Sequence, residues 1–501
     1  MSALLGIDLG TSSVKVVVYT TEGKILGLGS SEYPILTPRP GWAEQEPAVW
    51  WRATVNSVNA ACKAAGRPEI AAIGFSGQMH GPALLDKQGE LLGNAIIWAD
   101  QRSAPLLTEI ESTVGKKVLA EVCGTAPAAG FLISTLRWLQ LYDPARLEKI
   151  GKILLPKDYL RYRMTGEIAT DASDAAATGL FDVARRAWAW NVIETLKLPK
   201  DIFPEVHGSA QLCGTLRVDP AGELGLKPGI PIAAGSADQP AQAVGNGLNE
   251  PGLGSVTLGT GGQVFVPLAE PVFDSEARCH TFCHAPDSRW YLLGAMLSAG
   301  MALRWARHTL GSDQLSYPEL DQGAETVPIG TEGLFFLPYL VGERSPLMDP
   351  HARGTFVGLT LRHETRHLIR AVLEGISYAM RQIIETIVET GVQMDRWVAS
   401  GNGLASKFWR QMLADTLNRP LLRGNDANAA ERAGVGAAIL GGIGSGVLSG
   451  FKEAERFAPR FDEVTEPIPA NVEQYDRAYA RFKQVYPLLK DWFRERETSY
   501  D

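Results

Sequence analysis

Two short turns of glycine and hydroxyl residues are the first places in this 501-residue chain where chemistry is expected. The first, Gly10-Thr11-Ser12-Ser13, follows an apolar run that ends in Asp8 and precedes Lys15. Backbone N–H groups and hydroxyls in such a turn can hold phosphate oxygens, and glycine lets a ligand come close. A carboxylate at position 8 can hold Mg²⁺, directly or through water. From these residues alone, an ordinary hairpin turn explains the segment equally well.

Two further turns extend the pattern over the second half of the chain. Leu258-Gly259-Thr260-Gly261-Gly262 repeats the segment that begins at Leu9, about half a chain length further along. Gly401-Asn402-Gly403 follows an expected strand and opens a helix, and helix N-termini suit anions. Together the three turns predict a nucleotide held between two similar domains, although a repeat of five residues alone can arise by chance. Motifs of the P-loop and dinucleotide-binding types are missing from the sequence.

The elements that must carry these turns alternate between strands and helices. Period-two and apolar runs predict strands at residues 4–8, 14–19, 24–31, 70–76, 95–98 and 397–401. Helical periodicity predicts helices at residues 47–65, 364–390, 408–417, 434–440 and 472–496. This mixture indicates an α/β protein, with a seam near residues 245–252, which are rich in Gly, Asn and Pro.

Composition narrows the function classes. The sequence is 45% hydrophobic and 21% charged, which is typical of globular proteins, and it has no apolar run long enough to span a membrane. A formal net charge of −8 with scattered charges argues against nucleic-acid or membrane partners. Five cysteines, an odd and small number, and the lack of a basic N-terminal leader predict a reducing, cytoplasmic location.

Two clusters could be mistaken for sites. The run from Cys279 to His284 holds two cysteines and two histidines, but on a strand these side chains alternate between faces. A half-buried strand is therefore predicted in place of a zinc site. Trp42, Trp50 and Trp51 could form a sugar-stacking platform, but helix packing and loop anchoring are the favoured interpretation.

Several longer motifs together resemble those of the FGGY carbohydrate kinases, in the actin-like ATPase superfamily, and within that family the xylulokinases most. They cover nearly the whole chain and comprise 7–12, 76–81, 155–160, 258–261, 354–359 with 367–374, and 409–415. Three positions depart from the family pattern. Thr135 stands where a Lys is usual, Gly261-Gly262 replaces Ser-Gly, and Ser400-Gly401-Asn402 replaces a run of three glycines.

The resemblance implies an α/β fold of two actin-like (ribonuclease H-like) domains around a central cleft. Residues 1–247 would form the N-terminal domain, with the sugar site and the first phosphate motif. Residues 248–501 would carry the second phosphate and adenosine motifs and a C-terminal helix. The implied reaction is phosphorylation of D-xylulose to D-xylulose 5-phosphate by ATP with Mg²⁺. Other ketoses or polyols, a non-kinase actin-like ATPase and a weakly active sugar sensor remain alternatives, and family members are often homodimers.

The resemblance also assigns roles to individual residues. Asp238 matches the catalytic base, which accepts the proton of the attacking sugar hydroxyl, and Asp8 would hold Mg²⁺ through water. Without the resemblance, Asp238 could be a turn or cap residue and His80 a plain strand-end histidine. The implied sugar contacts are Met79, His80, Gln239, Trp98 and Asp100. The implied ATP contacts are Gly10, Thr11, Ser12, Ser13, Lys15, Gly259, Thr260, Gly261, Gly401 and Asn402.

Overall fold

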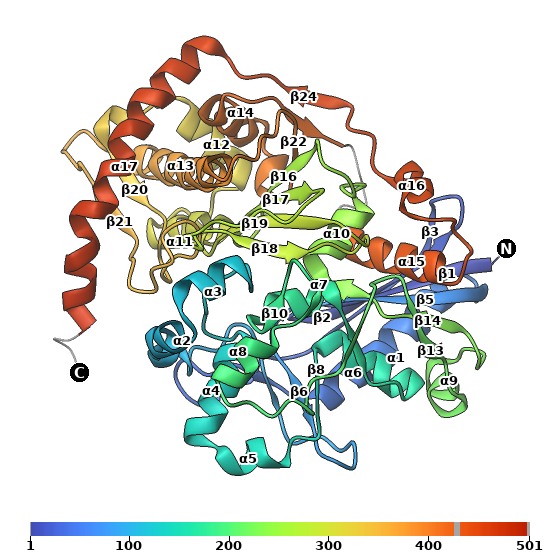
Figure 1. Ribbon diagram of the computed structural model, residues 1–501. Coiled ribbons are helices and arrows are strands. Elements are labelled where there is room, and N and C mark those ends of the chain that lie inside the picture. The colour runs from blue at the N-terminus through green and yellow to red at the C-terminus, as the bar shows by residue number, and fades with distance from the viewer. Residues whose placement is uncertain (1, 425–430, 498–501) are drawn as a thin grey trace.

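The computed structural model describes residues 2–424 and 431–497. The chain folds into two lobes, each built on a seven-stranded sheet with helices packed around it (Figure 1). The first lobe holds the blue and green N-terminal half of the chain, and the second holds the yellow and most of the red segments. Mixed strands and helices confirm the predicted α/β class.

The first sheet runs from two short strands at one edge to longer strands at the other. Its order is β13 (Leu212–Thr215), β14 (Pro231–Ala233), β5 (Glu69–Gly77), β1 (Ser2–Leu9), β2 (Ser13–Thr20) and β3 (Ile25–Glu32), with β15 (Ser236–Ala237) also paired to β5. The second sheet runs β18 (His280–Cys283), β19 (Trp290–Met296), β17 (Gly262–Leu268), β16 (Gly254–Leu258), β22 (Trp397–Ser400), β23 (Leu421–Arg423) and β24 (Glu463–Thr465).

The two sheets repeat one topology. β1 pairs antiparallel with β2 and parallel with β5, and β16 pairs antiparallel with β17 and parallel with β22. The antiparallel pairs β2–β3 and β17–β19 extend one side in the same way. The repeat expected from the two Gly-Thr turns is therefore present in strand order and direction.

Helices of the first lobe surround its sheet. They are α1 (Pro47–Ala64), α2 (Leu107–Val114), α3 (Lys116–Glu121), α4 (Leu132–Tyr142), α5 (Pro144–Lys149), α6 (Pro156–Thr165), α7 (Ala172–Ala175), α8 (Trp190–Thr195), α9 (Val218–Leu224) and α10 (Asp238–Gly245). The second half adds α11 (Gly300–Thr309), α12 (Tyr317–Glu325), α13 (Thr365–Glu389), α14 (Lys407–Leu417), α15 (Arg432–Gly444), α16 (Phe451–Ala454) and α17 (Pro469–Glu497). The predicted helices end or begin within three residues of these bounds, except that α15 extends four residues further at its C-terminal end.

Short two-stranded sheets brace the connections between these elements. They pair β4 (Glu44–Gln45) with β7 (Ala95–Ile96), β6 (Ala83–Leu85) with β8 (Lys152–Leu154), β9 (Ala169–Asp171) with β12 (Glu205–His207), β10 (Phe181–Asp182) with β11 (Ala187–Trp188), and β20 (Phe335–Leu337) with β21 (Thr355–Val357). The strand predicted at 95–98 is thus only two residues long.

Helix α15 comes late in the chain but packs on the first sheet, beside β1 and β5 (Figure 1). Small residues allow this contact. A Cβ added at Gly6 would lie 1.9 Å from the Gly434 carbonyl oxygen, and one at Gly74 would lie 1.9 Å from that of Ala437.

Helix α13 forms the centre of the second lobe, and α17 lies at its outer edge (Figure 1). Buried Tyr475, Tyr479 and Phe482 attach α17 to the lobe, whereas Leu488 and Trp492 are exposed. Among the helices of the described residues, none combines the length and apolarity needed to cross a membrane.

Candidate active site

Asp8 lies near the end of β1, next to the first Gly-Thr turn. The turn is closed by the Gly10 N–H, which donates to the Ser13 carbonyl oxygen over 3.0 Å. Ser76 Oγ, on the parallel neighbour β5, donates to Asp8 Oδ1 over 2.7 Å. Burial raises the pKa of Asp8, against the effects of this hydrogen bond and of the Lys15 charge. Asp8 is therefore a carboxylate whose charge the surrounding protein only partly compensates.

Asp238 is the first residue of α10, directly after β15. Its Oδ1 is buried and has no hydrogen-bond partner among the described residues. Burial, and then the charge of Asp8, raise the pKa of Asp238 to about 7, although hydrogen bonds from Gln239 oppose them. The pKa is raised because the fold buries this carboxylate near a like charge.

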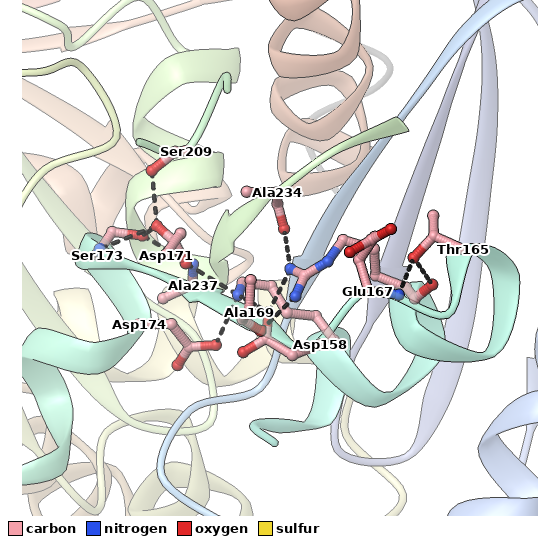
Figure 2. Close-up of polar contacts among 12 residues, drawn as sticks. Asp158, Thr165, Glu167, Ala169, Asp171, Ser173, Asp174, Ser209, Ala234 and Ala237 are labelled. Carbon is pink, nitrogen blue, oxygen red and sulfur yellow. Dashed lines mark hydrogen bonds and ion pairs between the residues drawn. The ribbon is translucent and has the colours of Figure 1, made fainter. Parts of the chain in front are cut away.

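The backbone before α10 is held by a buried polar network (Figure 2). The Ala237 N–H donates to Ser173 Oγ over 3.1 Å, and this hydroxyl donates to Asp171 Oδ2 over 2.6 Å. Arg161 Nη1 donates to the carbonyl oxygen of Ala234 over 2.9 Å. Both contacts fix the segment that delivers the first residue of α10 to the site.

The same network contains five charged side chains that have no solvent exposure. Lys157 Nζ lies 2.7 Å from Asp158 Oδ1, 2.9 Å from Asp171 Oδ1 and 3.3 Å from Asp174 Oδ2. Arg161 Nη1 also lies 2.7 Å from Asp158 Oδ1. Burial, together with the Asp158 and Asp171 charges, raises the pKa of Asp174 well above its usual range. Two cations and three acidic side chains therefore pair with one another in the interior of the lobe.

Met79 and His80, two predicted sugar contacts, follow β5 and are nearly buried. His80 Nδ1 lies 2.8 Å from the Ala177 carbonyl oxygen, and its ring stacks on Phe131 with 3.9 Å between ring centres. Because a carbonyl only accepts hydrogen bonds, Nδ1 carries the proton and Nε2 keeps a lone pair. Burial lowers the pKa of His80 well below its usual range, so the ring is neutral.

Trp98 and Asp100, the other predicted sugar contacts, lie in one loop after β7. Trp98 Nε1 donates to Thr11 Oγ1 over 2.9 Å, which ties this loop to the first turn. Both Asp100 oxygens accept hydrogen bonds from protein groups, namely Arg102 Nε at 2.9 Å, Arg102 Nη2 at 2.8 Å and the Ala43 N–H at 2.6 Å. In this structure Asp100 supports the loop, and its contact with sugar stays a prediction.

The second turn joins β16 to β17, just as the first joins β1 to β2. The Gly259 N–H donates to the Gly261 carbonyl oxygen over 2.9 Å, and Thr260 O accepts from two N–H groups at the start of α11. A Cβ at position 261 would lie 2.6 Å from the Met296 carbonyl oxygen, which explains why glycine is favoured here over the usual serine. Thr135, another departure, is buried within α4.

The third turn lies directly against the second. Gly401 has a φ of +83°. A Cβ there would lie 2.4 Å from the Leu258 carbonyl oxygen, so only glycine fits. Ser400 Oγ and Thr257 Oγ1 are 2.6 Å apart and join β22 to β16. Asn402 then precedes a short 3₁₀ turn rather than a regular helix. The structure thus brings together the predicted second phosphate turn and the adenosine turn.

The Cys/His run forms β18, but all four of its residues are buried, in contrast to the predicted half-buried strand. The first lobe covers its second face, because Phe131 contacts His280 and the Gly124 carbonyl oxygen accepts from the Thr281 N–H. Outside residues 1, 425–430 and 498–501, no group of three or more His, Cys, Asp or Glu could hold a metal ion.

The tryptophans expected to serve packing do so. Trp50 is fully buried in α1, and its Nε1 donates to Gln45 over 3.0 Å, while Trp51 Nε1 donates to Glu223 over 2.8 Å. Trp42 lies under the Arg102 guanidinium, 3.5 Å from its carbon.

Several residues that shape the site were not singled out from the sequence. Ser76 and Lys157 stood inside motifs that carried the resemblance, but their contacts require three-dimensional proximity. Gln78 Oε1 is buried without a partner among the described residues, one position before Met79. Arg344 lies in a loop after β20 with no period-two or helical pattern, so only its charge within an apolar stretch could have marked it.

Comparisons with known proteins agree with this geometry. Residues 3–245 match the N-terminal domain model of the FGGY family of carbohydrate kinases, and residues 254–445 match the C-terminal one. A xylulose kinase of Escherichia coli (strain K12) is 38% identical over 83% of this chain and 85% of its own. A glycerol kinase of Thermococcus kodakarensis is 31% identical over 98% of this chain and 97% of its own.

A crystal structure titled as a xyloylose kinase from Brucella ovis superposes with a TM-score of 0.91, at 33% identity, over 98% of this chain and 100% of its own. The two lobes are therefore the two domains of an actin-like kinase fold, and both family models together cover most of the chain. The chain belongs to the FGGY family of carbohydrate kinases.

Proposed function

We propose that this carbohydrate kinase transfers the γ-phosphoryl group of ATP to D-xylulose and forms D-xylulose 5-phosphate. The observation that carries the proposal is the Asp238 carboxylate at the start of α10. Its buried Oδ1 has no hydrogen-bond partner among the described residues, and it is in electrostatic contact with Asp8. The Met79-His80 pair and the xylulose kinases among the relatives support a ketose as the acceptor.

Asp238 would act as the base toward the attacking hydroxyl. Phosphoryl transfer passes through a loose transition state, so the hydroxyl loses its proton late and positioning matters more than strong basicity. A carboxylate with a pKa of about 7 can take that proton near neutral pH. The network around Ser173 and Arg161 holds the preceding backbone, so the carboxylate needs little reorganisation when the sugar binds.

ATP would contact the three turns, and Mg²⁺ would be held near Asp8. The residues fit a hard divalent cation, because the charge of Asp8 acts on Asp238 and Asp238 Oδ1 has no hydrogen-bond partner within the described chain. Of the two carboxylates, Asp8 is the one that would hold the ion through water, because it lies beside the first turn. When bound, the ion supplies positive charge to the phosphate oxygens.

A second candidate is phosphorylation of another ketose or a polyol, which the glycerol kinase relative favours. A non-kinase ATPase differs from both, because it would consume ATP without any sugar.

The test measures ADP release with a panel of D-xylulose, D-ribulose, L-xylulose, gluconate and glycerol. We expect D-xylulose to give the highest kcat/KM, and ADP release to be negligible without a sugar. Asp238→Asn should abolish sugar-dependent turnover, whereas Asp491→Asn, at an exposed position of α17, should not alter it. Equal turnover with and without sugar would contradict the kinase, and a higher kcat/KM for another acceptor would contradict xylulose.

Three further predictions remain open. We propose domain bounds of 1–247 and 248–501, a homodimer, and a cytoplasmic location. Light scattering on the purified protein measures the oligomeric state, and cell fractionation measures the location.

A further inference from the structure

Arg344 extends from a second-lobe loop toward aromatic rings of the first lobe. Its guanidinium carbon lies 5.9 Å from the ring centre of Trp98 and 5.6 Å from that of Phe131. Among the described residues, its guanidinium makes no hydrogen bond and no ion pair. A half-buried cation held only by rings keeps five unused donors, and a ligand that accepts hydrogen bonds would satisfy them.

The loop that carries Arg344 is fixed to the end of β19. The Ser345 N–H donates to the Ala295 carbonyl oxygen over 2.9 Å. Glu343 Oε1 accepts from the N–H groups of Leu297 at 2.9 Å and of Arg344 at 2.8 Å. The Glu343 carboxylate thus binds backbone groups and is not paired with the guanidinium. Arg344 is therefore positioned by its backbone while its donors remain open.

His80 supplies the complementary group. Its ring stacks on the same Phe131, and its Nδ1 is used by Ala177, so that Nε2 offers only a lone pair. The positive charge of Arg344 adds to burial in lowering the pKa of His80, which shows that the two groups feel each other and that the ring stays neutral. A donor-only group and an acceptor-only group therefore both lie against the ring of Phe131.

A ligand that satisfies both Arg344 and His80 carries a hydrogen-bond acceptor next to a hydrogen-bond donor. An open-chain ketose carries one in its carbonyl oxygen, which only accepts, and in the hydroxyl on the adjacent carbon. A polyol offers hydroxyls at both positions, and each must direct its own hydrogen away from the guanidinium. The pair of Arg344 and His80 therefore distinguishes the two classes by chemistry as well as by shape.

We propose that Arg344 is a specificity-determining residue that donates to the carbonyl oxygen of an open-chain ketose while His80 Nε2 accepts from the neighbouring hydroxyl. This inference rests on the proposed function, because it assigns the sugar side of that site. It also places one sugar contact on the second lobe, so that the sugar is held from both sides.

The experiment compares Arg344→Met, Arg344→Lys and the wild type on D-xylulose and on xylitol, its reduced counterpart. Charge-assisted hydrogen bonds lead us to expect a rise in KM for D-xylulose of about 10- to 100-fold in Arg344→Met. The kcat should change little, and the ratio of kcat/KM between the ketose and the polyol should fall by the same factor. Arg344→Lys should keep part of this ratio, and the exposed Arg304→Met should match the wild type.

Several outcomes would overturn the inference. One is a ratio of kcat/KM between ketose and polyol that stays unchanged in Arg344→Met. Another is an equal fall in kcat for every acceptor, which is expected if the guanidinium binds the phosphoryl group. A parallel loss on both acceptors with a lowered Tm assigns Arg344 a structural role; Arg344→Lys and calorimetric titration with D-xylulose check this case.

The proposed function fails separately. If the wild type prefers D-ribulose, the proposed substrate is wrong, and the D-ribulose and ribitol pair tests Arg344 in the same way. If the wild type prefers a polyol over every ketose, the inference about Arg344 is overturned too.

Discussion

Two groups of buried charge in the first lobe differ in how completely the protein compensates them. Around Lys157, two cations and three acidic side chains lie within ion-pair distance of one another, without solvent exposure. Asp8 and Asp238 instead place two acidic groups in electrostatic contact, and no cation among the described residues forms an ion pair with either. Internal pairing supports a fixed scaffold, whereas uncompensated charge marks the place where a ligand must supply the opposite charge.

Replacing Asp238 should give the largest effect on activity. Asp238→Asn removes the base but not the fold, so kcat/KM should fall by about 10²- to 10⁴-fold. The stability of the Asp238→Asn variant, in contrast to its activity, should not fall. Because the pKa of Asp238 is raised to about 7 in the folded protein, folding is weakened as pH rises from about 4 to 7. Thermal denaturation at pH 8 should therefore show a Tm no lower than that of the wild type; a marked fall in Tm would contradict the comparison.

Replacing Lys157 should instead lower the stability of the protein. Lys157→Met leaves the Asp158, Asp171 and Asp174 carboxyls buried without their shared cation, and breaking a buried pair costs about 3–5 kcal/mol. Urea denaturation should show this loss in the free energy of unfolding. The control is Lys87→Met, at an exposed position, which should change little. A Lys157→Met variant of wild-type stability would show that the network is not a scaffold.

The pH profile of activity sharpens the contrast. With the pKa of Asp238 raised to about 7, kcat/KM should rise about tenfold per pH unit below 7 and level off above it. Asp8→Asn removes the nearby negative charge, so the midpoint of the residual activity should move to lower pH. The same variant should need more Mg²⁺ for half-maximal rate. A midpoint that stays in place would mean that the two carboxylates are not coupled.

Trp98→Phe should give the smallest effect. The change keeps the ring under Arg344 but removes the hydrogen bond from Nε1 to Thr11, a contact worth about 1 kcal/mol. Steady-state kinetics should show a change of about fivefold in KM for ATP or sugar, with the Tm nearly unchanged. A loss as large as that of Asp238→Asn would show that this link does more than align the first turn.

The sequence allowed much of the fold and part of the site to be predicted. Apolar runs and Gly-containing turns were enough for β1, β2, β5 and β22, since these local patterns determine strands and their ends. The role of Asp100 and the burial of β18 depend on contacts between segments far apart in the chain, which no local pattern reports. Likewise, the raised pKa of Asp238 comes first from burial and then from a charge more than two hundred positions away, and Arg344 has no motif of its own.

Helix α15 has a consequence for how the chain can be divided. It follows most strands of the second sheet in the chain, yet its backbone lies against Gly6 of β1 and Gly74 of β5, where a side-chain carbon would have no room. Cutting the polypeptide near residue 250 would leave one fragment with an unprotected glycine-lined sheet and the other with the helix that belongs on it. The two fragments would therefore have to be produced together to regain a native enzyme, and neither would be a self-sufficient module.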